Sequence, residues 1–225
     1  MTIYDLHQGQ PVTMAGEPPE QAQAGLILVH GRGSTAESIL SLAYQLDRPG
    51  FAYLAPQAYG NTWYPHSFLA PLDHNEPALS SALVMLETLV DYLAGAGIPP
   101  EQTMLLGFSQ GACLALEFVA RHARRYGGVA GLSGGLIGPD GAPRDYAGSL
   151  AGTPIFLGCS DNDPHIPQQR IRHSAEVLRR LGAQVTERLY PGMGHTVNED
   201  ELEFVRAVMT DLVNHTRTDA PAPAK

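Results

Sequence analysis

Residues 103–124 read TMLLGFSQGACLALEFVARHAR, an apolar run followed by a helix-forming segment. Between the two lies Gly107-Phe108-Ser109-Gln110-Gly111, which matches the G-x-S-x-G turn that presents a serine at the top edge of a sheet. The two glycines suit this turn because the helix backbone is pressed against the strand and leaves no room for a Cβ atom. We therefore predict a strand, a sharp turn and a helix, with Ser109 exposed at the turn.

Ser109 is the candidate nucleophile of this chain. A serine hydroxyl reacts poorly unless a neighbouring base removes its proton, so the rest of the sequence must supply that base. Ser133 and Ser160 are rival serines, but neither lies between a strand and an immediately following helix. The alternative interpretation is that GFSQG is only a glycine-bounded turn.

The whole chain continues the pattern of this unit. Short apolar runs bounded by Gly, Pro and Asp alternate with longer segments of helical period, which indicates an α/β protein with parallel strands joined by helices. The predicted strands cover residues 26–30, 51–55, 103–108, 129–132, 154–159 and 184–190. The predicted helices cover residues 35–46, 76–94, 110–124, 168–181 and 198–213. We expect a mostly parallel central sheet with helices on both faces.

The 225 residues suit a single domain. We assign residues 1–215 to it and expect residues 216–225, TRTDAPAPAK, to form a disordered tail. The segment 133–152 is rich in Gly and Pro and too short for a large lid domain. An open cleft follows, which favours small or medium substrates over long ones.

The composition of the chain limits the classes of partner and the location that we expect. Fourteen Lys and Arg against 23 Asp and Glu give a net charge of -9, which disfavours binding to a nucleic-acid backbone. Cys113 and Cys159 form no disulfide framework, and the N-terminus has no signal-peptide pattern. No stretch is read as a transmembrane segment, so we expect no stable membrane insertion and a cytoplasmic location. A homodimer is compatible with the sequence.

A base and an acid follow Ser109 in the chain. His195 lies in the glycine-rich loop after the last predicted strand, at the sheet edge where α/β active sites assemble. Its imidazole can accept and return a proton near neutral pH. Asp161 and Asp163 follow the preceding strand, and either one can orient the imidazole or cap a turn. The order Ser, Asp, His is that of α/β-hydrolases.

Backbone N–H groups complete the expected site. His30-Gly31-Arg32-Gly33 ends the first clear strand, and its glycines let backbone amides face a tetrahedral intermediate. We predict Arg32 N–H and Gln110 N–H as the two oxyanion donors. We expect His30 to shape the loop by hydrogen bonding. The Arg32 side chain is equally compatible with contact to an acidic substrate and with exposure to water.

Taken together, HGRG, GFSQG, DPHIP and PGMGH resemble the carboxylesterase/phospholipase family of α/β-hydrolases, which includes acyl-protein thioesterases and small bacterial carboxylesterases. The likeness spans roughly residues 25–213. In that family the acid stands before Pro in a D-P-x-[VI]-P loop, which selects Asp163. A Trp follows an Ala-Pro pair, which implies that Trp63 and Tyr64 line the acyl pocket; simple packing is the alternative for Trp63.

The expected function is hydrolysis of short to medium-chain carboxylic esters through an acyl-enzyme, without metal or organic cofactor. A metal site would need histidines such as His30, His66, His74 or His165 to converge, and no ligand spacing supports this. Thioesters or lysophospholipids are alternative substrates, although the thioesterases usually carry an apolar residue where Arg32 stands. Dienelactone-type hydrolases are similar but use Cys where this chain has Ser109. A non-catalytic binding protein is the remaining alternative.

Overall fold

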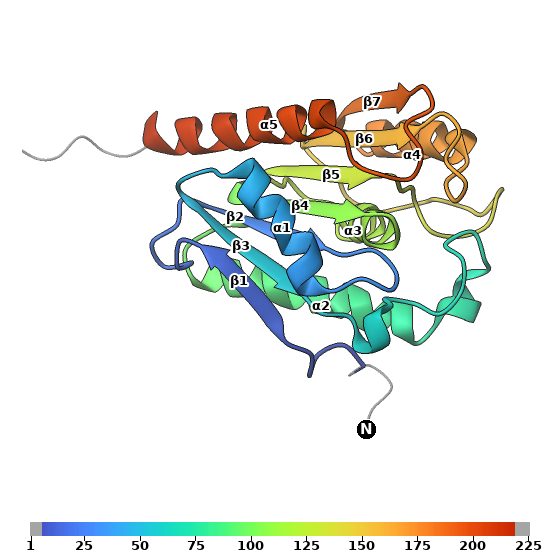
Figure 1. Cartoon of the computed structure of the whole chain (residues 1–225), viewed down its shortest axis with the longest axis horizontal. Coiled ribbons are helices and arrows are strands. Elements are labelled where there is room, and N and C mark those ends of the chain that lie inside the picture. The colour runs from blue at the N-terminus through green and yellow to red at the C-terminus, as the bar shows by residue number, and fades with distance from the viewer. Residues whose placement is uncertain (1–5, 219–225) are drawn as a thin grey trace, which may run out of the picture.

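The computed structural model describes residues 6–218 and consists of a seven-stranded sheet covered by helices (Figure 1). The strand order is β1-β3-β2-β4-β5-β6-β7. The strands are β1 (Val12–Gly16), β2 (Ala24–Val29), β3 (Phe51–Pro56), β4 (Thr103–Phe108), β5 (Gly128–Leu132), β6 (Pro154–Ser160) and β7 (Gln184–Tyr190). Neighbouring strands from β3 to β7 are parallel, and β1 pairs with β3 antiparallel.

Five α-helices cover the two faces of the sheet, as expected. They are α1 (Ala36–Leu46), α2 (Ala78–Gly95), α3 (Gln110–Arg121), α4 (Gln168–Arg180) and α5 (Glu199–Thr218). Helices α1 and α5 pack on one face, in front of the sheet in Figure 1, and α2, α3 and α4 pack on the other. Three short 3-10 helices lie in the connections: η1 (Tyr59–Asn61), η2 (Leu72–Asn75) and η3 (Pro100–Gln102).

The central strands are apolar runs in the sequence because they are buried in the fold. Every residue of β2, β3 and β5 is buried, because helices cover both faces of these strands. Strand β1 was not predicted. It is a half-exposed edge strand whose sequence, VTMAG, has no apolar run, and its pairing with β3 comes from the fold rather than from local pattern.

The structure differs from two of the predictions made from the sequence. The sequence predicted no transmembrane segment, but α2 is long and apolar enough to cross a membrane, judged by length and composition alone. In the structure, 56% of this helix is buried inside the protein, where it packs in the core. Helix α5 continues to Thr218, so residues 216–218 are helical rather than part of a tail. The rest of the predicted tail lies outside the described residues.

The register of the sheet brings distant segments to one edge. Val29 pairs with Gly107, so the chain leaving β2 lies beside the turn after β4. Ser160 pairs with Tyr190, so the loops after β6 and β7 are also neighbours. The predicted site segments therefore meet at the carboxyl ends of the parallel strands.

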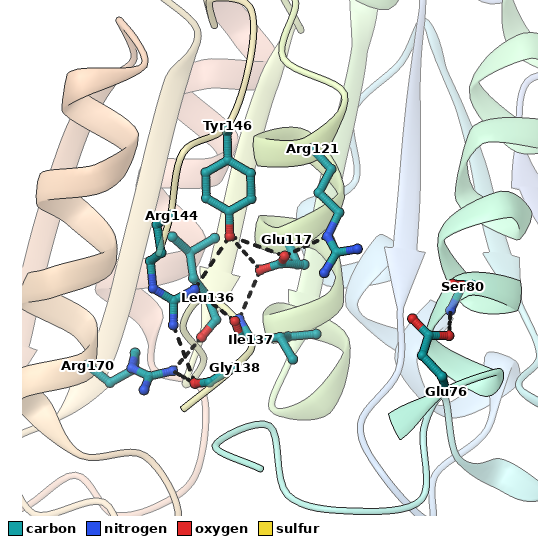
Figure 2. A network of polar contacts seen from close by, with 10 residues as sticks. All are labelled: Glu76, Ser80, Glu117, Arg121, Leu136, Ile137, Gly138, Arg144, Tyr146 and Arg170. Atoms are coloured by element: carbon teal, nitrogen blue, oxygen red, sulfur yellow. Dashed lines mark hydrogen bonds and ion pairs between the residues drawn. The ribbon is translucent and has the colours of Figure 1, made fainter. Parts of the chain in front are cut away.

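The connection between β5 and β6 is anchored rather than projecting as a lid (Figure 2). Buried Glu117 on α3 accepts hydrogen bonds from the Ile137 backbone N–H (3.0 Å) and the Tyr146 hydroxyl (3.0 Å). Buried Arg170 on α4 donates to the Gly138 carbonyl oxygen (2.7 Å). These contacts hold the connection against two helices, in agreement with the expectation of no large lid domain.

Candidate active site

Ser109 sits at a strained turn between β4 and α3. Its φ and ψ are 55° and -118°, a conformation that non-glycine residues rarely adopt. The turn is so tight that a Cβ on Gly107 would lie 2.2 Å from the Gly111 carbonyl oxygen, and a Cβ on Gly111 would lie 2.0 Å from the Val29 carbonyl oxygen. The steric reason predicted for both glycines is therefore confirmed.

His195 reaches Ser109 from the loop after β7. Its Nε2 lies 2.9 Å from Ser109 Oγ. Gly192 and Gly194 both have positive φ (62° and 78°), which lets the loop turn back over the sheet edge. The imidazole also packs against Phe108, with ring centroids 4.9 Å apart. This contact and the bond to Ser109 fix the ring beside the serine hydroxyl.

Asp163 holds the other side of the imidazole. Its Oδ2 lies 2.7 Å from His195 Nδ1, and its Oδ1 accepts hydrogen bonds from the backbone N–H groups of His165 (2.8 Å) and Ile166 (3.1 Å). Burial raises the pKa of the Asp163 carboxyl, but the hydrogen bonds from His195 and the two amides outweigh it and leave the pKa below its ordinary value. The ionised carboxylate therefore stabilises an imidazole that carries its proton on Nδ1, which leaves Nε2 free to accept from Ser109.

The Asp161 carboxylate joins two loops. Its Oδ1 accepts a hydrogen bond from the Gly192 backbone N–H (2.9 Å), which ties the loop after β6 to the loop that carries His195. Of the two aspartates that the residues alone left open, Asp163 is the one that contacts the imidazole.

Arg32 and Gln110, whose backbone N–H groups are the predicted oxyanion donors, come from different elements. Gln110 is the first residue of α3, where N–H groups have no partner within the helix, and Arg32 lies in the loop after β2. Within residues 6–218, neither N–H donates to another protein group. His30 supports the loop as expected: its Nδ1 bonds the Gly31 carbonyl oxygen (2.7 Å), and its Nε2 accepts from the Ala58 N–H (3.1 Å).

Ser109 lines a cavity with a volume of about 840 Å³. Its apolar walls include Ile39, Leu42, Phe68 and Ile166, and its polar lining includes serine hydroxyls and Arg32. The lining residues are Gly31, Arg32, Ser34, Ser38, Ile39, Ser41, Leu42, Tyr64, Pro65, His66, Ser67, Phe68, Phe108, Ser109, Gln110, Cys113, His165, Ile166, His195 and Val197.

The two aromatic residues predicted to bind substrate are placed differently. Tyr64 lines the cavity. Trp63 is fully buried and, in the described part of the chain, is not among the residues that line it. The Trp63 Nε1–H donates to the His30 carbonyl oxygen (2.8 Å), and its ring lies 5.0 Å from the His30 ring. Trp63 thus packs against His30 in the loop after β2, which is the alternative that the sequence left open.

The Arg32 side chain is exposed, which is one of the two roles expected for it, and it also binds its own chain; contact with an acidic substrate stays a prediction. Its guanidinium donates to Thr62 Oγ1 (3.0 Å) and to the carbonyl oxygens of Pro65 (2.9 Å) and His66 (2.6 Å). It therefore binds its own chain, although it lies at the cavity edge. The Gln110 side chain, to which the sequence analysis gave no role, binds the same segment.

Other reactive groups near the cavity are ill suited to compete with Ser109. Burial raises the pKa of Cys113 to about 12 and that of Cys159 also to about 12, so both thiols stay protonated at neutral pH. Across residues 6–218, no group of three or more His, Cys, Asp or Glu side chains is arranged to hold a metal ion.

Comparison with known proteins identifies the family. Residues 11–212 match the model of the phospholipase/carboxylesterase family. The chain belongs to this family. A crystal structure of a phospholipase/carboxylesterase from Dyadobacter fermentans is 41% identical, with a TM-score of 0.86, and the match covers 90% of this chain and 97% of that one. The α/β-hydrolase fold predicted from the sequence is thereby confirmed.

Two curated relatives match over shorter regions. An acyl-protein thioesterase 1 from Gibberella zeae is 34% identical over 130 residues, which covers 54% of this chain and 52% of that protein. A probable carboxylesterase SOBER1-like protein from Arabidopsis thaliana is 26% identical over 133 residues, covering 59% and 51%. The matched region thus spans about half the length of these curated relatives.

Proposed function

We propose that this protein is a serine carboxylic-ester hydrolase in which Ser109, His195 and Asp163 act as a catalytic triad. The observation that carries the proposal is the continuous chain of hydrogen bonds from Ser109 Oγ through both nitrogens of His195 to Asp163 Oδ2, at 2.9 and 2.7 Å. Membership of the phospholipase/carboxylesterase family supports the same reaction class.

In the proposed mechanism, Ser109 Oγ attacks the ester carbonyl carbon while His195 Nε2 takes the hydroxyl proton. The imidazolium that forms is stabilised by the ionised Asp163. His195 then returns the proton to the departing alkoxide, which leaves an acyl group on Ser109. Water attacks this acyl-enzyme with His195 again as the base, and the carboxylic acid leaves as Ser109 regains its proton.

The negative oxygen of each tetrahedral intermediate is assigned to the backbone N–H groups of Arg32 and Gln110. Their lack of a protein acceptor within residues 6–218 supports this role, because donors kept free and fixed before the reaction cost no reorganisation when charge develops. The position of Gln110 at the start of α3 adds the positive end of the helix dipole.

We further propose that the substrates are short to medium-chain esters. The anchored connection after β5 supplies no lid to bury a long chain, and the cavity lining combines apolar side chains with serine hydroxyls. Tyr64 and Phe68 are the aromatic side chains proposed to contact the acyl or alcohol part.

Hydrolysis of p-nitrophenyl esters from acetate to palmitate, beside a matched acyl thioester series, tests this function. We expect activity that peaks at short or medium chains. A preference for long-chain thioesters would move the protein toward the activity named for the thioesterase relative. Folded protein that hydrolyses neither series would contradict the proposal. The cytoplasmic location, the homodimer and the absence of nucleic-acid partners stay predictions.

A further inference from the structure

The side chains of both proposed oxyanion residues bind one short segment, residues 62–66. The Arg32 guanidinium makes the three hydrogen bonds to it described above. Gln110 Oε1 accepts from the Trp63 backbone N–H (3.0 Å), and Gln110 Nε2 donates to the Tyr64 carbonyl oxygen (2.8 Å). The segment is therefore bonded to the side chains of both residues whose backbone N–H groups are the proposed oxyanion donors.

Thr62 is the one residue whose side chain contacts both partners within the described chain. Its Oγ1 accepts a hydrogen bond from Arg32 Nη1 (3.0 Å) and lies 3.2 Å from Gln110 Oε1 and 3.1 Å from the Tyr64 carbonyl oxygen. The single hydroxyl proton can go to either of these two acceptors. Thr62 is half-buried and, among residues 6–218, does not line the cavity, so it acts away from the substrate.

The loop that carries the Arg32 N–H needs such support. It lies between Gly31 and Gly33, and Gly33 has a φ of 75°, so its backbone has little intrinsic rigidity. The Gly33 N–H adds a backbone hydrogen bond to the Asn61 carbonyl oxygen (2.7 Å), next to Thr62. Oxyanion donors are effective when they are fixed in place before the intermediate forms. Contacts to residues 61–66 therefore add to the support that His30 gives this loop.

We propose that Thr62 is a positioning residue of the oxyanion hole, because its hydroxyl links the side chains of Arg32 and Gln110 and so holds their two backbone N–H groups at a set separation. The inference rests on the proposed esterase function. It predicts that loss of the hydroxyl weakens the binding of the tetrahedral state and leaves binding of the ground-state ester intact.

The test is Thr62→Val, which keeps the shape and removes the hydrogen bonds. Removing a whole oxyanion donor costs about 100- to 1,000-fold in kcat, so loosening both donors is expected to lower kcat by ~10-fold with KM changed less than about twofold. The inhibition constant of an alkylboronic acid, which forms a tetrahedral adduct on serine, should rise by the same factor. Thr62→Ser should restore both values.

Thr88→Val is the matched control. Thr88 is exposed on α2, and its Oγ1 donates to the Val84 carbonyl oxygen (2.9 Å), so the same chemical change is made away from the cavity. We expect its kinetics to match those of the unmodified protein. If Thr62→Val does not fold, Gln110→Met removes the opposite side of the link and keeps its backbone N–H, and the same parallel loss is expected.

Unchanged kcat in folded Thr62→Val, or a loss of kcat without a change in boronic acid affinity, would overturn the inference. So would a loss that appears in KM alone. Ser109→Ala, measured beside these variants, separates the two proposals. Retained hydrolysis in Ser109→Ala would reject the esterase mechanism itself, whereas an inactive Ser109→Ala with normal Thr62→Val would reject only the role of Thr62.

Discussion

Replacement of Asp163 by Asn would change the proton arrangement of His195 while keeping the shape of the site. Two backbone N–H groups, those of His165 and Ile166, point at Oδ1 of the carboxylate. In the Asp163→Asn variant these donors would select the amide oxygen for that position, because an NH₂ group there would face two other donors. The amide NH₂ must then face His195 Nδ1.

The consequence for catalysis can be estimated. An NH₂ group facing Nδ1 makes this nitrogen an acceptor and places the imidazole proton on Nε2, which then cannot take the proton of Ser109. A comparable change in another Ser-His-Asp enzyme lowers kcat about 10⁴-fold. We expect a loss of about 10³- to 10⁴-fold here, which corresponds to about 4 to 5.5 kcal/mol of transition-state stabilisation.

The assay is steady-state hydrolysis of p-nitrophenyl butyrate at a fixed, near-neutral pH, with Asp161→Asn as the matched control. Among residues 6–218, the Asp161 carboxylate accepts a hydrogen bond from the Gly192 N–H, which an Asn oxygen can also accept, so the kcat of Asp161→Asn should stay within a few-fold. A larger loss in Asp161→Asn than in Asp163→Asn would refute the reasoning and move the acid to Asp161.

Two other substitutions give distinct readouts. Burial raises the pKa of Glu201 to about 7 from an ordinary 4.5, so the folded state holds this proton more tightly than the unfolded chain and loses stability as pH rises through 7. Glu201→Gln should remove up to about 3 kcal/mol of this pH-dependent change in the free energy of unfolding, measured by urea denaturation at about pH 5 and about pH 8.5; an unchanged pH dependence would contradict the assignment. Arg32→Leu should lower kcat/KM for neutral and acidic esters alike, because the guanidinium binds backbone oxygens; selective loss on acidic esters would show that it contacts substrate.

The parts of the fold that could be predicted share a strong local signal. Strands buried on both faces appear as apolar runs, and the tight turn around Ser109 demands glycines at fixed positions, so both leave a mark in the sequence. Strand β1 leaves no such mark because it is half-exposed and paired only at the sheet edge. The start of the tail was misplaced because the polar residues after Val213 continue a helix that local composition does not reveal.

Some residues of the candidate site could likewise be located from the sequence, and others could not. Ser109, His195 and the two aspartates follow strand ends, and strand ends can be located from the sequence. The choice of Asp163 needed either the family resemblance or the hydrogen bond to His195. The link through Thr62 could not be predicted, since it joins side chains 30 and 48 positions apart in the sequence, and only the folded chain brings them together.

Labelling with a fluorophosphonate, followed by mass spectrometry of the digested protein, tests the proposed nucleophile most directly. The probe reacts with a serine that is activated by a base, so we expect one adduct per chain, on the peptide that contains Ser109, with ester hydrolysis lost in proportion. Ser109→Ala should remain folded and take up no probe. Folded protein that is labelled elsewhere or not at all, or hydrolysis that survives in Ser109→Ala, would rule out Ser109 as the nucleophile.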